Sequence, residues 1–110
     1  MNHSSELLKG NLQTIVLKVL EDYGKMYGYE IVQRVKELSG KRINLTEGAL
    51  YPTLHRMEQR GLLKTEVIMS GKRMRKYYRI TSEGKDAVDK RVEEFVAFIK
   101  TMSTLLSVKV

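Results

Sequence analysis

The sequence contains no cysteine and no tryptophan, and only one proline, among its 110 residues. Without cysteine there is no disulfide framework, no thiolate metal site and no cysteine nucleophile, which fits a reducing cytoplasm. No apolar run approaches the roughly 20 residues that a bilayer-spanning helix needs. The first six residues also lack the basic and then apolar layout of a signal peptide. We therefore expect a cytoplasmic protein without a membrane segment.

Residues that commonly carry out catalysis or bind metals are scarce. His3 and His55 are the only histidines, and His55 with Glu58 supplies two metal ligands without a third. No Gly-x-Ser-x-Gly motif, Walker loop or Gly-x-Gly-x-x-Gly fingerprint occurs. The sequence thus predicts neither an enzyme nor a metal or cofactor site.

Positive charge, in contrast, is abundant and unevenly distributed. Lys and Arg number 20 against 13 Asp and Glu, a formal net charge of +7. Residues 1–84 hold 15 basic and 9 acidic side chains, whereas residues 85–110 hold 5 and 4. A basic body with a nearly neutral tail is typical of a polyanion-binding domain joined to a protein-binding segment. Many small proteins are simply basic, so charge alone does not decide between these interpretations.

Apolar residues spaced three and four apart predict helices over about 6–23 and 29–38, and from about 46 to Gly61. Asn44 and Thr46 are both candidate caps of the third helix, and the sequence does not choose between them. Its expected buried stripe consists of Ala49, Leu50, Leu54 and Met57. The only proline, Pro52, falls inside this helix, where it typically costs about 3 kcal/mol unless it lies close to the helix start. Such a departure from local rules is expected at functional or strained sites.

The apolar period then shortens, which predicts strands over 62–69 and 74–80 joined by a turn at 70–73. Thr81 is expected to cap a last helix that runs to about residue 107. The apolar positions of this helix repeat at steps of four and three, as in the seam of a coiled coil. They are Val88, Val92, Phe95, Ile99, Met102 and Leu106.

Three helices followed by a β-hairpin is the layout of a winged helix-turn-helix. The expected fold class is mainly α with a β-hairpin, with a DNA-binding domain over 5–80 and a C-terminal dimerisation helix over 81–108. The third helix would enter a DNA major groove, and the hairpin would be the wing. Residues 70–80 carry five basic side chains and no acid. Exposed hairpins also use Lys and Arg against edge pairing, but an acid-free cluster favours phosphate contacts.

Four stretches of the sequence resemble the PadR-like transcriptional regulators. They are MYGYEI at 26–31, EGALYPTL at 47–54, MEQRGLL at 57–63 and KYYRITSEG at 76–84. The resemblance, which covers residues 7–84, implies a homodimeric and usually repressing DNA-binding protein of the short type, with a single C-terminal helix. It also implies that Tyr51 and Pro52 lie on the recognition helix and that residues 70–75 form the wing.

The candidate DNA-binding residues lie at the start and outer face of the third helix and on the wing. Tyr51 and His55 are one turn apart and are expected to reach base edges or sugar-phosphate, although Tyr51 could equally be a half-buried packing residue. The full set is Asn44, Thr46, Glu47, Tyr51, Pro52, His55, Lys72, Arg73, Arg75 and Lys76. The expected partner is a double-stranded, pseudo-palindromic DNA operator.

The apolar stripe of the last helix needs a partner, either a second copy or the body of its own domain. The expected dimerisation residues are Leu8, Leu12, Val16, Val88, Val92, Phe95, Ile99, Met102 and Leu106. Some short PadR-like proteins bind flat apolar molecules at the dimer centre. Phe95, Phe98 and Met102 are the corresponding candidates for a small apolar or aromatic effector, or else ordinary residues of the dimer core.

Winged helices also serve as protein-interaction modules, which is the main alternative function. A protein-binding wing should expose apolar side chains and mixed charge, whereas the charges of this wing are all positive. RNA binding is less favoured because the sequence predicts no aromatic-rich sheet on which bases would stack.

Overall fold

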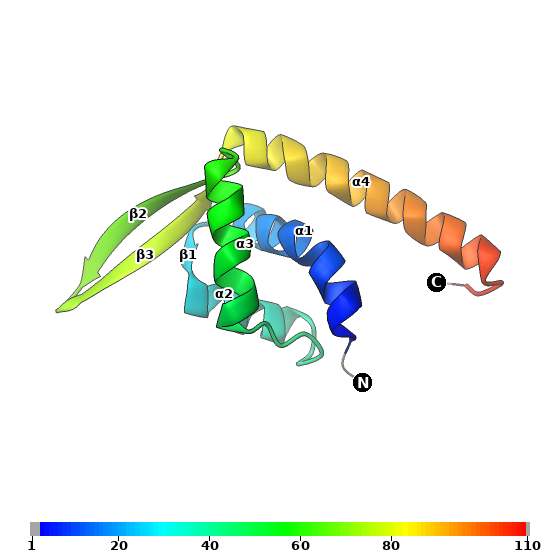
Figure 1. Ribbon diagram of the computed structural model, residues 1–110, viewed down its shortest axis with the longest axis horizontal. Helices are drawn as coiled ribbons and strands as arrows, with labels where there is room; N and C mark the ends of the chain where they lie inside the picture. The colour runs from blue at the N-terminus through cyan, green and yellow to red at the C-terminus, as the bar shows by residue number, and fades with distance from the viewer. Residues whose placement is uncertain (1–2, 110) are drawn as a thin grey trace.

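The computed structural model describes residues 3–109. The elements are α1 (Ser5–Tyr23), β1 (Met26–Tyr27), α2 (Gly28–Leu38), α3 (Glu47–Gln59), β2 (Leu63–Ser70), β3 (Arg73–Ile80) and α4 (Ser82–Leu105). The β2–β3 hairpin projects from one side of the three-helix body, and α4 extends from the other side as a long arm (Figure 1). This arrangement confirms the predicted winged helix-turn-helix with an added C-terminal helix.

One hydrophobic core lies between the first three helices, the base of the sheet and the start of α4. Its most buried large side chains, each at most 2% exposed, are Val16, Leu17, Leu20, Ile31, Leu50, Leu54, Met57, Leu63, Tyr78 and Val88. The predicted stripe of α3 is wrong at Ala49, which is exposed, and Thr53 is buried in its place. Thr53 is accommodated because its hydroxyl donates to the Ala49 carbonyl at 3.1 Å.

The sheet has three antiparallel strands in the order β1-β3-β2, one strand more than the sequence predicted. The two residues of β1 are too few to show a period, and they pair with Tyr78 and Tyr77 of β3. In the hairpin Ser70 pairs with Arg73, so the turn contains only Gly71 and Lys72. Gly71 has φ +64°, as a tight two-residue hairpin requires.

Thr46 caps α3, and Asn44 belongs to the preceding loop. The Thr46 hydroxyl accepts the Ala49 N–H at 3.2 Å, whereas the Asn44 side-chain amide donates to the Lys41 carbonyl at 3.0 Å. Pro52 lies in the second turn of α3, so it removes a helical hydrogen bond to Gly48. Both residues are exposed, which leaves the Gly48 carbonyl open to water.

Thr81 caps α4 as predicted, with its hydroxyl accepting the Gly84 N–H at 3.0 Å. The first half of α4 packs on the body, where Arg91 donates to the Gln13 side chain at 2.9 Å. The second half is open, with Phe95 43% and Phe98 56% exposed. Burial of the α4 stripe is therefore incomplete within one chain. Within residues 3–109 no helix has the length and apolar character needed to cross a membrane.

Candidate nucleic-acid interface

The outer face of α3 is open to solvent at most of the positions predicted to contact DNA. Exposed members of that set are Asn44, Thr46, Glu47, Pro52 and His55. The helix presents this face because Leu50, Leu54 and Met57 hold its opposite side in the core. Thr46 and Asn44 already make the capping and loop hydrogen bonds described above, so their positions are set before any ligand binds.

Tyr51 is half-buried and packs on the first residue of α2. A Cβ at Gly28 would overlap the Tyr51 hydroxyl and would lie 2.7 Å from the ring carbon Cζ. The glycine therefore allows the ring to lie directly against the α2 backbone, which joins the two helices of the helix-turn-helix. Sequence reasoning treated packing and base contact as equal alternatives for Tyr51, and the contact with Gly28 favours packing.

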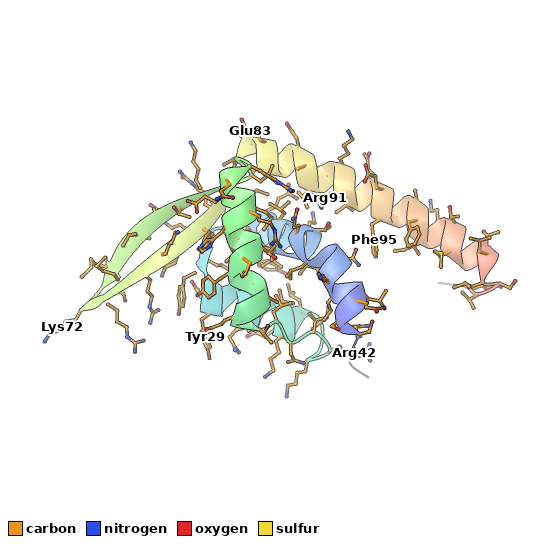
Figure 2. All side chains as sticks on the ribbon, in the orientation of Figure 1. Tyr29, Arg42, Lys72, Glu83, Arg91 and Phe95 are labelled. Carbon is orange, nitrogen blue, oxygen red and sulfur yellow. The ribbon has the colours of Figure 1, made fainter. Side chains whose placement is uncertain are left out.

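Basic side chains of the wing occupy three different environments. Lys72 lies at the tip (Figure 2), and within residues 3–109 neither Lys72 nor Arg73 forms an ion pair. Arg75 is half-buried, and its guanidinium donates to the Tyr27 hydroxyl at 2.7 Å and stacks 4.4 Å from that ring. Lys76 lies 3.7 Å from Glu58 at the end of α3. Among these four predicted wing residues, Lys72 and Arg73 are thus the most available to a phosphate, while Arg75 and Lys76 also fix the wing to the body.

The β2–β3 hairpin contains one acid, and that acid forms an ion pair. Glu66 on β2 lies 2.8 Å from the Lys25 ammonium, and this contact holds the pKa of the Glu66 carboxyl below its usual value. The next acid along the chain is Glu83, at the start of α4 (Figure 2). The whole segment between them is therefore free of acidic side chains, and its field is positive.

Two further basic residues, Lys41 and Arg42, lie exposed in the loop that leads into α3. Lys41 has φ +66° and Gly40 φ +61°, so the loop turns sharply just after α2 ends. The sequence signal that could have identified these two residues is the absence of acidic residues from 38 to 46 around two adjacent cations. Irregular loops show no apolar period, and sequence reasoning did not select them.

The wing also has an apolar side that sequence reasoning missed. Val67, Met69 and Met74 are 59%, 60% and 70% exposed. The sequence showed the charges of the hairpin but not how its two faces differ. The wing therefore has one of the two features expected of a protein-binding wing, exposed apolar side chains, although its charges are mainly positive.

A groove of about 650 Å³ runs between α1 and α4. It is lined by six of the predicted dimerisation residues: Leu8, Val92, Phe95, Ile99, Met102 and Leu106. Phe98 lines it as well, so the three candidate effector residues lie in the same groove. Figure 2 shows Phe95 on the side of α4 that faces α1.

Three of the predicted dimerisation residues require correction. Leu12, Val16 and Val88 are 7%, 0% and 0% exposed and belong to the core of their own chain. The body buries the α1 stripe from Leu12 onward, whereas it buries the α4 stripe fully only as far as Val88. Apolar periodicity marks which residues share a helix face, but it does not show where along the helix that face leaves the body.

Comparison with known proteins gives one consistent family. The sequence matches the Transcriptional regulator PadR-like family over residues 16–90. It is 42% identical over 64 residues to a transcriptional regulator of Mycobacterium tuberculosis, a match that covers 56% of this chain and 60% of the relative.

Solved structures agree in fold over nearly the whole chain. A transcriptional regulator of Clostridium thermocellum has a TM-score of 0.84 and 30% identity, covering 93% of this chain and 96% of that one. A PadR family transcriptional regulator of Eggerthella lenta has a TM-score of 0.83 and 31% identity, covering 94% and 88%. The family match spans both helices of the helix-turn-helix, the wing and the start of α4, and the chain therefore belongs to the PadR-like family of transcriptional regulators.

Proposed function

We propose that this protein is a sequence-specific DNA-binding regulator that acts as a homodimer and represses the genes whose promoters its operator overlaps. The observation that carries the proposal is the exposed face of α3 beside a cationic wing whose residues 67–80 contain no acid, in a PadR-type fold. We infer that α3 enters the major groove and that Lys72 and Arg73 contact phosphates on either side of it.

The proposed dimer is built on the groove between α1 and α4, with α4 of a second copy covering it. Six apolar groove residues per chain, at about 1.5–3 kcal/mol each, contribute on the order of 10 kcal/mol per chain. Two chains contribute about twice that, against an association cost of roughly 4–15 kcal/mol for the pair. A two-fold symmetric dimer carries two α3 helices, so its operator is expected to be pseudo-palindromic with half-sites about one helical turn, or a multiple of it, apart.

The same groove is the proposed effector site. Phe95, Phe98 and Met102 offer flat and adaptable apolar contacts to a small apolar or aromatic molecule. Such a molecule would relieve repression only if it binds a DNA-incompetent arrangement of the dimer better than the competent one.

Fluorescence anisotropy with DNA from upstream of the protein's own gene, against a shuffled duplex, tests the proposal at several salt concentrations. A sequence-specific regulator should bind the operator with an affinity about 10³-fold or more higher than its affinity for the shuffled duplex at physiological salt. Arg73→Ala should weaken binding to both duplexes and reduce the salt slope by about 0.9 per lost phosphate contact. Equal and steeply salt-dependent binding of both duplexes by the unmodified protein would contradict sequence-specific regulation through this DNA.

The alternative is a protein-interaction module, and one observation favours it. The exposed apolar residues on the wing are the feature expected of a protein-binding surface. Unchanged affinity for both duplexes after Arg73→Ala, with the protein still dimeric, would support this alternative.

A further inference from the structure

The two faces of the wing differ in chemistry. The register places Met69 opposite Met74 and Val67 opposite Lys76, so these side chains share one face. The other face carries Arg73, Arg75 and Tyr77, which alternate with them along β3. We call Val67, Met69 and Met74 the methionine face. All three are more than half exposed, and together they form an apolar cluster on the surface of the wing.

This face lies on the same side of the sheet as the recognition helix. Thr65 and Lys76 are its next members toward the body, and both contact Glu58 near the end of α3, at 2.9 Å and 3.7 Å. The methionine face therefore continues the surface on which α3 lies. A molecule that binds the outer side of α3 and reaches the wing meets it directly.

Charge around the methionine face selects its partner. Lys76 shares the methionine face and Lys72 lies at the tip beside it, and the sequence contains no acid between Glu66 and Glu83. A partner must therefore combine negative charge with apolar surface. The minor groove of DNA does so, because sugars and base edges lie between two phosphate backbones, and apolar side chains such as methionine are used by proteins to contact it.

We propose that Met69 and Met74 form an apolar contact with sugars and base edges of the DNA minor groove, next to the major groove that α3 enters. This inference rests on the proposed DNA-binding function and adds a contact that does not involve phosphate. It explains why the wing exposes apolar side chains next to its cations. Affinity then has two separable parts, a salt-dependent part from the cations and a salt-independent part from the methionines.

The test is the double variant Met69→Ala/Met74→Ala, measured by anisotropy on the operator over a salt series. The two thioether side chains would be partly buried against the DNA in the complex, so losing them should weaken operator binding by about tenfold. The slope of log affinity against log salt should stay unchanged, because no phosphate contact is lost. Lys72→Ala is the matched control at the same tip, and it should lower the slope instead. Met69→Leu/Met74→Leu keeps the apolar volume and should restore most of the affinity.

Each remaining outcome is decisive. Unchanged affinity of the alanine variant would overturn the inference and leave the methionine face to a protein partner. A loss accompanied by a reduced salt slope would also overturn it, because the residues would then act through the cations. Equal binding of operator and shuffled DNA by the unmodified protein would refute the proposed function itself, and this inference with it. The melting temperatures of the alanine and leucine double variants should match that of the unmodified protein, since the side chains are exposed. If the alanine variant melts at a lower temperature, the leucine variant becomes the test. A loss of operator affinity in the leucine variant would then overturn the proposal.

Discussion

Replacing Gly84 with alanine should destabilise the protein, because the new methyl group has no space. A Cβ at this position would overlap the carbonyl oxygen of Leu62 and lie 2.6 Å from Cγ1 of Ile80. The Leu62 carbonyl cannot easily turn away, since it accepts the Thr81 N–H at 3.0 Å and the Thr81 hydroxyl at 3.1 Å. The start of α4 is thus held against the residues that lead into β2.

The magnitude follows from two opposing effects. Inserting a methyl group into a fully packed site typically costs 1–3 kcal/mol, that is, about 2 kcal/mol. Alanine in place of glycine inside a helix returns at most about 1 kcal/mol. Because the obstructing atom is backbone, the packing cost should prevail, with a net loss of about 1 kcal/mol or more. A loss of that size lowers the melting temperature by roughly 4–8 °C in a domain of this length.

Urea and thermal unfolding followed by circular dichroism measure the effect, at one protein concentration because a dimer's stability depends on concentration. Gly10→Ala is the matched control, since Gly10 lies inside α1 and no neighbouring side chain or element comes within 4 Å of the place its methyl group would take. It should raise stability by up to about 1 kcal/mol. If Gly84→Ala were as stable as Gly10→Ala, the packing of α4 on the Leu62 carbonyl described here would be wrong.

Three further predictions concern DNA binding, assembly and pH. Gly28→Ala should displace the Tyr51 ring and weaken operator binding, and should have no further effect in a Tyr51→Ala background, as anisotropy would show. Phe95→Asp should dissociate the proposed dimer, as light scattering would show, because the groove would bury a charge. Ala97→Asp, exposed on α4 outside the groove, should leave the proposed dimer intact. The lowered pKa of Glu66 means that its ion pair stabilises the fold above the ordinary value of 4.5 and is lost as pH falls through the lowered one. Across that pH range the free energy of unfolding of Glu66→Gln should change slightly less than that of the unmodified protein. Identical pH profiles of the two proteins would show that the Glu66–Lys25 ion pair does not contribute.

Several features of the fold could be predicted because their causes are local. Apolar spacing located the helices, and Thr81 was recognised as the cap of α4 from its place before a periodic segment. The basic residues of the hairpin are visible in any reading of the chain. Other features had no local signal: β1 has only two residues, and it exists because Met26 and Tyr27 pair with β3 about fifty residues later.

The sequence by itself determined the element order, the helix-turn-helix and wing, and the residue types that face outward from α3. These properties depend on periodicity, caps and turns, which act over a few residues. Only the tertiary structure decided that Val88 is buried while Phe95 lines an open groove, although both belong to one stripe. Only it showed that Arg75 is engaged with Tyr27, and that the wing has an apolar face beside its cations. The physical reason is that burial and pairing depend on where the helices end relative to one another, which no local pattern encodes.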